Sequence, residues 1–382
     1  ANSDTYTYNG LARTASGFTA TGLVNGQTTA VLTGVTVSGG GTNAGTYTVT
    51  PSGTDTNYNL SFVNGTMTIN KASLTVTAND AAKIYDGLAY TGGNGLSYAG
   101  FVNGETSAVL GGAVAYSGTA QNAVNAGTYT ITPSGLTAAN YSLTYANGTL
   151  TVNKAPLTVT ANDANKTYDG LAYVGGNGVT YSGFVNGETT AALGGVVAYS
   201  GTSQNAINAG TYAITPSGLT ASNYALSYVN GTLTVDKALL AITASNDAKF
   251  VTQADAANFN GVTYSGFVNG ENSTVLSHLP VVTRPHSTGA GAGSYPGELV
   301  PSGAAATNYN FAYVAGDYTI IPASQLYVKF SNVSQSYGIT PTFTVTSAKY
   351  LDAHGNAITD LTGSTIVNGN NFSITDGAGS TT

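Results

Sequence analysis

Cysteine and tryptophan are absent from this sequence, and charged residues are scarce. The 382 residues include one Met, and Asp, Glu, Lys and Arg together make up 7% of the chain. Without cysteine there are no disulfides, no thiolate zinc sites and no cysteine nucleophiles. Since proteins average about 25% charged residues, Ser, Thr, Asn and Gly must supply most of the polar surface here.

The same scarcity excludes several classes of protein. A net charge of −7, from 17 acidic and 10 basic residues, leaves no basic stripe for nucleic acid. No long apolar run predicts a membrane span, while 42% apolar residues and 26 tyrosines are too many for a disordered chain. Sparse charge also means weak repulsion between copies, which permits side-by-side association. Residues 1–20 lack a signal-peptide pattern, so we expect a mature segment.

What is present is a repeat of 83 residues. The motif Gly-Phe-Val-Asn-Gly-Glu begins at Gly100, Gly183 and Gly266, and a weaker copy begins at Gly22. Other motifs return at the same spacing: Ala-Gly-Thr-Tyr ending at Tyr47, Tyr129 and Tyr212 with a variant at Tyr295, Pro-Ser-Gly from Pro51, Pro133, Pro216 and Pro301, and Asn-Gly-Thr from Asn64, Asn147 and Asn230. Several motifs sharing one period indicate a tandem array.

The array divides into five predicted repeats. Their boundaries are residues 1–71, 72–154, 155–237, 238–322 and 323–382. Repeat 5 is partial and is recognised by Tyr337-Gly338. Repeat 1 aligns Ala1 with Ala78 and therefore lacks the first strand, which suggests either a window from a longer array or a strand supplied by another chain.

Each repeat is predicted to be β-structure. Apolar and polar residues alternate on both sides of Asn147-Gly148, a dipeptide favoured in hairpin turns, so we expect a hairpin that pairs Tyr145 with Leu150 and Tyr141 with Lys154. The same hairpin is expected in the other repeats, pairing Phe62 with Met67, Leu60 with Ile69, Tyr228 with Leu233, Leu226 with Val235, Tyr313 with Tyr318 and Phe311 with Ile320. The one helical candidate is a short turn at residues 105–110 and its copies. The predicted fold class is all-β, mainly antiparallel, in β-sandwich or β-grasp-like modules.

The boundaries between repeats contain no flexible linker. Between the alternating patterns that end at Val152 and begin at Leu157 there are only four residues, whereas a flexible connection needs a Gly/Ser-rich stretch. We therefore expect the last strand of one repeat to pass almost directly into the next repeat. Strands of about 3.3 Å per residue then predict a rod of roughly 150 to 200 Å.

Catalytic chemistry has little support. None of His278, His286 and His354 recurs, and no nucleophile-elbow, phosphate-loop or zinc-protease motif is present. We expect no enzyme and no catalytic, cofactor or metal site. His278, Arg284 and His286 form the densest non-repeating cluster, which we interpret as an exposed loop rather than a site.

The recurring charged residues are explained by local structure. Asp80, Asp163, Asp86 and Asp169 fit turns, and Glu105, Glu188 and Glu271 fit the first turn of the short helical segment. Calcium binding at the junctions is the alternative. It needs several converging carboxylates, usually indicated by Asp-x-Asp spacing, and the sequence contains no such spacing. Lys71, Lys154 and Lys237 are expected to pack on a cross-strand tyrosine, with a lysine–asparagine isopeptide bond as the alternative. Tyr129, Tyr212, Tyr145 and Tyr228 fit core positions better than carbohydrate stacking.

Taken together, these motifs resemble the YDG and MBG repeat domains of large bacterial adhesins. The resemblance rests on Leu-Thr-Val-Thr-Ala-Asn-Asp (74–80), Tyr85-Asp86-Gly87 with Lys83, Gly-Phe-Val-Asn-Gly-Glu, Asn125-Ala-Gly-Thr-Tyr129 and Asn147-Gly-Thr-Leu-Thr-Val-Asn-Lys154. Repeat 4 departs from the pattern, with Phe250-Val251-Thr252 in place of Tyr-Asp-Gly, and repeat 5 resembles the YGX-type MBG domain. Many such adhesins are of the filamentous haemagglutinin type, which implies a secreted, cell-surface location and an outer-membrane secretion partner.

Three functions follow as hypotheses. The first is a structural stalk that extends an adhesive region from the cell and supports attachment or biofilm. The second is a multivalent array of weak sites for extracellular glycan, mucin or matrix polysaccharide. The third is an extracellular matrix fibre in which neighbouring copies associate by strand donation to the incomplete repeat 1.

Overall fold

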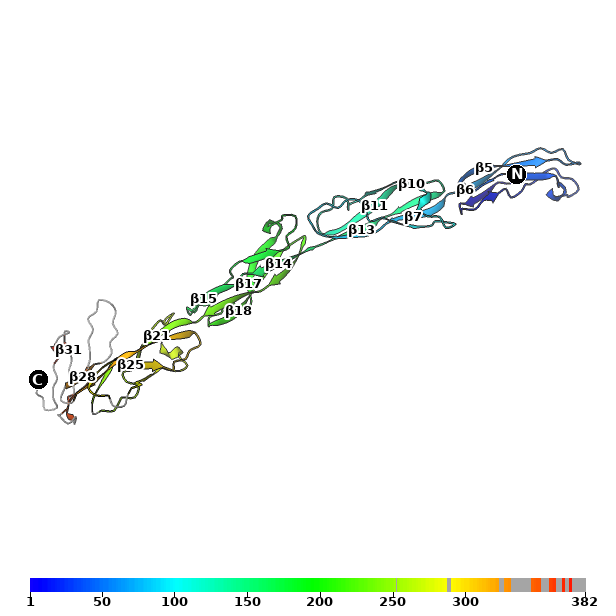
Figure 1. Cartoon of the computed structure of the whole chain (residues 1–382). Helices are drawn as coiled ribbons and strands as arrows, with labels where there is room; N and C mark the ends of the chain where they lie inside the picture. The colour runs from blue at the N-terminus through cyan, green and yellow to red at the C-terminus, as the bar shows by residue number, and fades with distance from the viewer. Residues whose placement is uncertain are drawn as a thin grey trace. The chain divides into compact units, whose positions relative to one another are not determined.

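The computed structural model of the chain consists almost entirely of β-strands (Figure 1). It describes residues 1–251, 253–286 and 290–322, together with the backbone of five short strands between Leu326 and Phe372. Within these ranges the helical segments are four single 3-10 turns, one in each of the first four repeats: η1 Thr29–Val31, η2 Ser107–Val109, η3 Thr190–Ala192 and η4 Ser273–Val275. The all-β prediction with one short helical turn per repeat is confirmed.

Repeat 2 illustrates the topology. Its seven strands are β7 Ala72–Ala78, β8 Ala81–Ile84, β9 Leu96–Ala99, β10 Leu110–Ser117, β11 Gly127–Ala138, β12 Tyr141–Ala146 and β13 Gly148–Asn153. They form two sheets, one of order β12-β7-β9 and one of order β10-β11-β13-β8. Most pairings are antiparallel, but β7 with β12 and β8 with β13 are parallel.

The predicted hairpin at Asn147-Gly148 is wrong. Strand β12 pairs with β7 in one sheet and β13 pairs with β8 and β11 in the other, so Tyr145 and Leu150 do not face each other across a turn. At Asn147 the chain passes from the β12-β7-β9 sheet to the β10-β11-β13-β8 sheet. The segment between β7 and β8 makes the same passage directly beside it. The expected pairs in repeats 3 and 4 fail for the same reason, since the counterparts of β12 and β13 lie in separate sheets there, and those in repeat 1 fail because residues 58–63 are not a strand.

Gly148 is required by this crossing and not by a turn. A Cβ atom at Gly148 would lie 2.5 Å from the carbonyl oxygen of Ala78, on the neighbouring path. Its φ is not in the left-handed region that a type I′ turn demands. The other three repeats also have glycine at this position, namely Gly65, Gly231 and Gly316, each with a backbone oxygen closer than 3 Å to the added atom. The periodic glycine therefore marks close approach of two backbones.

The other repeats follow the same plan. Repeat 1 contains β1 Asp4–Thr7, β2 Arg13–Thr14, β3 Val35–Ser38, β4 Gly40–Gly41, β5 Gly45–Gly53 and β6 Gly65–Asn70, and its residues 58–63, the counterpart of β12, are not a strand. Repeat 3 contains β14 Ala155–Ala161, β15 Ala164–Thr167, β16 Val179–Ser182, β17 Gly194–Ser200, β18 Gly210–Thr220, β19 Tyr224–Val229 and β20 Gly231–Asp236. Repeat 4 contains β21 Ala238–Ala244, β22 Asp247–Phe250, β23 Val262–Ser265, β24 Val281–Thr283, β25 Gly293–Ser302, β26 Tyr309–Val314 and β27 Gly316–Ile321. Five strands follow: β28 Leu326–Phe330, β29 Val345–Leu351, β30 Ala357–Leu361, β31 Ile366–Val367 and β32 Asn371–Phe372.

Consecutive repeats are joined by a single residue. Lys71 separates β6 from β7, Lys154 separates β13 from β14, and Lys237 separates β20 from β21. The expectation that a last strand passes almost directly into the next first strand is confirmed. At these three boundaries the connection is too short to act as a flexible linker.

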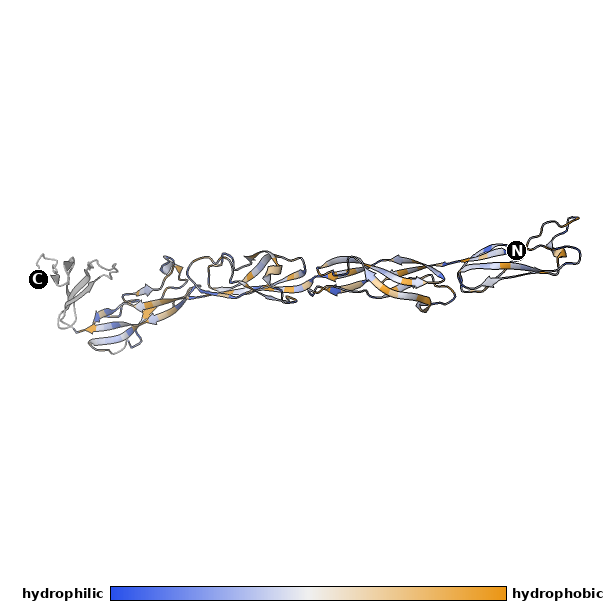
Figure 2. Cartoon of the chain, turned by 90° about the horizontal axis from the view of Figure 1, so that it is seen from above, coloured by the Kyte–Doolittle hydropathy of each residue, from blue (hydrophilic) through white to orange (hydrophobic). Residues whose placement is uncertain are grey.

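The hydrophobic cores straddle the repeat boundaries. One cluster contains Leu150 and Val152 of repeat 2 together with Leu157 and Tyr224 of repeat 3. Two others join repeat 1 to repeat 2 and repeat 3 to repeat 4 in the same way. Figure 2 shows the alternation of apolar and polar residues along the strands that produces these cores, and in β7 every second residue is buried. The half-repeats on the two sides of each boundary thus share one core.

The chain divides into two compact units, and neither ends at a repeat boundary. One unit contains residues 1–159, 180–197 and 218–229, and the other contains residues 160–179, 198–217 and 230–382. Each of the three boundary cores lies wholly inside one of these units.

Candidate functional site: the junctions between repeats

A half-buried carboxylate bridges two buried tyrosines at each junction. At the first, Glu105 of repeat 2 accepts a hydrogen bond of 2.5 Å from the Tyr8 hydroxyl of repeat 1 on Oε1, and another from the Tyr141 hydroxyl on Oε2. Both tyrosines are at most 4% exposed, and their rings meet edge to face with centroids 5.6 Å apart. We call this arrangement the tyrosine–glutamate clamp.

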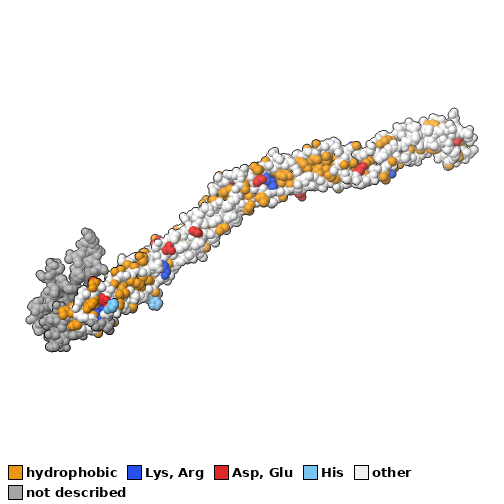
Figure 3. Space-filling model, viewed as in Figure 1, with side chains coloured by type: hydrophobic (Ala, Val, Ile, Leu, Met, Phe, Trp, Pro, Cys, Tyr) orange, Lys and Arg blue, Asp and Glu red, His pale blue; other side chains and the backbone are white. Residues whose placement is uncertain are grey.

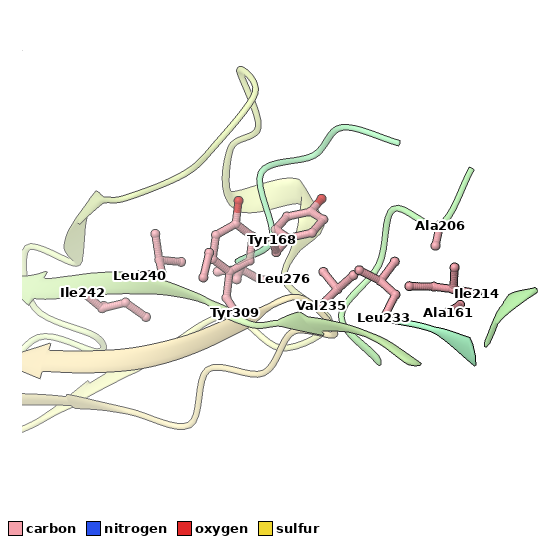
Figure 4. Packing of buried hydrophobic residues seen from close by; sticks show 11 residues of the cluster. Ala161, Tyr168, Ala206, Ile214, Leu233, Val235, Leu240, Ile242, Leu276 and Tyr309 are labelled. Atoms are coloured by element: carbon pink, nitrogen blue, oxygen red, sulfur yellow. The ribbon is translucent and has the colours of Figure 1, made fainter. Parts of the chain in front are cut away.

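The clamp recurs at the next two junctions. Glu188 accepts from Tyr85 at 2.5 Å and from Tyr224, and Glu271 accepts from Tyr168 and Tyr309 at 2.5 Å each. Figure 4 shows Tyr168 and Tyr309 side by side with both hydroxyls directed to the same side, within the core that runs from Leu233 to Ile242. Hydrogen bonds to an ionised acceptor are about twice as strong as neutral ones, so each clamp ties its two repeats together firmly.

Hydrogen bonding and burial shift the pKa of the clamp residues. The hydrogen bond between Tyr85 and Glu188 raises the pKa of Tyr85 to about 12, and burial raises the pKa of Tyr309 to about 12. Hydrogen bonds from Tyr224 and Tyr85 lower the pKa of Glu188. The favoured state is therefore an ionised glutamate between two protonated phenols.

The Tyr-Asp-Gly turn of one repeat packs against the Phe-Val-Asn-Gly-Glu loop of the next. The Asn186 amide of repeat 3 donates to the Gly87 carbonyl of repeat 2 at 3.2 Å. Gly87 has a φ of +74°, and a Cβ added there would lie 2.7 Å from the Asn186 Cβ. Turn conformation and close approach both demand glycine here. The equivalent contacts join Asn103 to Gly10 and Asn269 to Gly170.

A second asparagine closes the other side of each junction. The Asn223 side chain of repeat 3 accepts from the Ala126 amide of repeat 2 at 2.9 Å, and its Nδ2 donates to Asn125 Oδ1. Its backbone carbonyl accepts from the Ala155 amide at 2.9 Å. Asn140 and Asn308 make the same contacts at the other two junctions. The Asn-Ala-Gly-Thr-Tyr motif is thus a docking element as well as part of a strand.

The boundary lysines contact the backbone of the following repeat. Lys154 Nζ donates to the Ala221 carbonyl at 2.8 Å, and Lys71 and Lys237 donate to Ala138 and Ala306 at 2.9 and 3.2 Å. The predicted packing of Lys154 on Tyr141 depended on the hairpin pairing and is wrong, because Tyr141 is in the β12–β7 sheet. Each lysine bridges two repeats.

The turn role predicted for the aspartates is correct for Asp86 and Asp169 and wrong for Asp80 and Asp163, and the role predicted for the glutamates is wrong. The 3-10 turns are capped by Thr106, Thr189 and Asn272 and have no acidic residue in the first turn, so Glu105 and its copies serve the clamp instead. Asp80 accepts from the Thr149 amide at 2.7 Å, where the two crossing paths meet, and Asp163 does the same with Thr232. Asp86 and Asp169 accept from the amides of Leu88 and Leu171 in turns.

The recurring strand tyrosines lie as predicted. Tyr129 and Tyr212 are half-buried and pack against the cores. The Tyr145 hydroxyl bonds both backbone groups of Leu136, and Tyr228 bonds Leu219 in the same manner. Tyr145 and Tyr228 therefore make these hydrogen bonds within their own repeats.

The far end of repeat 4 lacks the clamp. The alignment of Phe250 with the tyrosine of Tyr-Asp-Gly is wrong by one residue. Val251 takes the position of Tyr168, because its amide bonds the Ile321 carbonyl as the Tyr168 amide bonds the Asp236 carbonyl. An ionic cluster is present instead: Asp255 contacts Lys249 Nζ at 2.6 Å and Arg284 Nε at 3.0 Å, and Arg284 lies 4.7 Å from the centre of the Tyr318 ring. The sequence after residue 322 contains no glutamate. For a fourth clamp, this sequence has neither the tyrosine donor at position 251 nor a glutamate acceptor after residue 322.

The non-repeating cluster makes separate contacts. Arg284 is 6% exposed and belongs to the Asp255 ion pair, whereas the exposed His286 pairs with Glu298 at 3.1 Å. His278 forms a backbone bridge to Ala305. The prediction of an exposed loop holds for His286 but is wrong for Arg284. His354 lies outside the described residues, and so do Tyr337 and Gly338.

Metal-binding and membrane-spanning features were searched for in the described part of the chain. There, no three His, Asp or Glu side chains gather as they would to hold a metal ion. In the same residues, no helix has the length and apolar character needed to cross a membrane.

The chain was also compared with known proteins. Weak matches among solved structures include Drosophila N-cadherin EC1-4 (9% identity, 72% of this chain and 83% of that chain covered, TM-score 0.19) and protocadherin gammaB7 EC3-6 (10% identity, 93% of this chain and 96% of that chain covered, TM-score 0.21). These scores are too low to carry an argument. No curated protein matches the sequence.

A family model does match. The model of the MBG domain (YGX type) matches residues 1–68, 74–151, 157–234 and 240–319. The four matches cover most of the chain and contain every clamp residue. This chain therefore belongs to the MBG domain family, of which it carries four copies in tandem.

Proposed function

We propose that this chain is a structural stalk segment of a secreted bacterial cell-surface adhesin, which extends an adhesive region from the cell and supports attachment or biofilm. The observation that carries the proposal is the shared core at each of the three described junctions, reinforced by a clamp. Bending at such a junction would separate packed side chains such as Leu157 and Tyr85. Each costs about 1.5–3 kcal/mol to expose, so stiffness is built into the connection.

The proposal assigns no catalytic role to the chain. Its recurring ionisable residues are engaged in clamps, turns and boundary contacts, each of which orders the backbone. A glycan-binding role would have to use residues that vary between repeats, because the recurring tyrosines lie in the cores and junctions.

Spin-label distances test the stiffness. Because the chain has no cysteine, Thr91→Cys and Val174→Cys place two labels at equivalent exposed positions of repeats 2 and 3. A narrow distance distribution by pulsed electron resonance is expected, and Glu188→Ala should broaden it. A distribution in the unmodified junction as broad as that of a flexible linker would refute the stalk.

Small-angle scattering on the full chain provides a second test. The proposal expects a rod-like particle of roughly 150 to 200 Å. A compact particle would favour recognition by individual repeats over a spacing function.

A further inference from the structure

Strands β10 and β17 leave one edge of their sheets open. β10 is the last strand in the order β10-β11-β13-β8, and β17 is last in β15-β20-β18-β17. Residues 111–115 of β10 are exposed on both faces, and in β17 Val196 is 81% exposed. These strands therefore offer unpaired backbone groups to a partner. We call β10 and β17 the open edges.

The open edges lie in uncharged stretches of the sequence, and a boundary lysine lies near one end of each: Lys71 Nζ bonds the carbonyl of Ala138, which is opposite Leu110 of β10, and Lys154 Nζ bonds the carbonyl of Ala221 beside β18. Residues 106–153 of repeat 2 and 189–235 of repeat 3 contain no Asp, Glu, Lys, Arg or His. On the face shown in Figure 3, acidic and basic side chains are few and are separated by uncharged surface. A symmetric contact between two copies brings like residues together, and along residues 111–117 of β10 and 194–200 of β17 no like charges would meet.

Soluble proteins usually protect an edge strand with Lys, Pro or a bulge. The open edges have neither Lys nor Pro, and β10 has a bulge that shifts its register against β11 between Gly112 and Ala115. The bulge shortens the run available for pairing, so a single edge binds weakly. Two edges in one chain strengthen the contact by multivalency.

We propose that the open edges are lateral contact sites at which two copies of this chain pair strand to strand. Residues 110–117 and 193–200 are identical except for Ala113 in place of Val196, so either edge of one copy accepts either edge of another. The small side chains, chiefly Gly, Ala and Ser, allow two backbones to approach. Repeat 4 is excluded, because β24 is followed directly by Arg284 and pairs with β25, which carries Glu298.

The proposal adds a self-association surface to the stalk and does not depend on its stiffness. Sedimentation equilibrium of the full chain over a range of concentrations tests it. The weight-average mass is expected to rise with concentration, and added salt should not reverse the rise because no ion pairs are involved.

Paired variants locate the contact. Ala113→Lys with Val196→Lys puts a charge on both open edges at exposed positions, and association should weaken about tenfold or more because like charges then meet. Thr91→Lys with Val174→Lys adds the same charge at exposed positions outside the strands and should associate like the unmodified chain. Circular dichroism establishes that both variants fold.

Three outcomes would overturn the proposal. The first is a chain that stays monomeric at every concentration. The second is an edge variant that associates as well as the unmodified chain, and the third is an equal loss of association in the Thr91 and Val174 control.

Discussion

Replacing Glu188 by Gln should loosen the junction between repeats 2 and 3 without altering its shape. Glu188 accepts from Tyr85 on one oxygen and from Tyr224 on the other. Glutamine keeps one acceptor oxygen but presents an NH₂ group to the second hydroxyl. Hydrogen bonds to charged groups contribute about 1.5–3 kcal/mol each, so we expect a local loss of about 2–4 kcal/mol.

Amide hydrogen exchange measures this loss where it occurs. The Ala126 amide of repeat 2 donates across the junction to the Asn223 side chain of repeat 3 at 2.9 Å and should exchange about 30 to 1,000 times faster in Glu188→Gln, at 1.4 kcal/mol per tenfold. The Ala44 amide of repeat 1 makes the same bond to the Asn140 side chain at the first junction and should be unaffected. Glu298→Gln, which alters an acceptor of the exposed His286, is the matched control. The reasoning is refuted if the exchange of the Ala126 amide is unchanged, or if the Ala44 amide accelerates equally.

Other perturbations should separate the junction from the repeats themselves. Tyr85→Phe should broaden the spin-label distance distribution across the junction, whereas Tyr145→Phe, which loses bonds to Leu136 within one repeat, should lower the urea midpoint without broadening that distribution. Because the pKa of Tyr85 is raised to about 12 from 10.0, its stabilisation is complete below about pH 10 and is lost as pH rises through 12, which the urea midpoint and tyrosinate absorbance should both record. Because the pKa of Glu188 is lowered, its contribution is present above the ordinary glutamate value of about 4.3 and declines as the pH falls below it, and Glu188→Gln should flatten this acid limb. Gly148→Ala, with a Cβ 2.5 Å from the Ala78 oxygen, should destabilise by about 1–3 kcal/mol in urea unfolding, whereas Gly291→Ala, with no atom within 4 Å, should be neutral.

The sequence predicted the repeat plan and the linker-free boundaries correctly. Periodicity is a strong signal, since residues that return every 83 positions must occupy equivalent places. Alternation along segments such as residues 150–159 identified strands, because side chains on a strand point to alternate faces. The alignment of Ala1 with Ala78 is also confirmed, because β1 pairs with β6 as β8 pairs with β13.

Strand pairing could not be predicted in the same way. Asn147-Gly148 satisfies the local pattern of a hairpin turn, but its backbone follows a second path that comes from residues 78–80, almost seventy positions earlier. Local composition carries no information on such a partner. One clue was available: Gly316 is kept where Ala315 replaces the asparagine, which indicates that the glycine is the required residue.

The clamp was missed because its three members are far apart in sequence. Tyr85, Glu188 and Tyr224 each recur with the period, and each had an adequate explanation inside its own repeat. Tyr85 lies 20 residues before Glu105 of its own repeat and 103 residues before Glu188 of the next, and the sequence does not indicate which of the two glutamates it contacts. The spacing is the same for Tyr168 and Glu271.

The identical construction of the junctions bears on how such chains change in evolution. Each junction joins a Tyr-Asp-Gly or Tyr-Asn-Gly turn to the next Phe-Val-Asn-Gly-Glu loop, and each connection is one lysine. Recombination that deletes or duplicates a whole period would therefore bring together two surfaces that already fit, with the core and the clamp restored at the new seam. The number of repeats can therefore change during evolution without a misfolded intermediate, and the length of the protein changes in steps of one repeat.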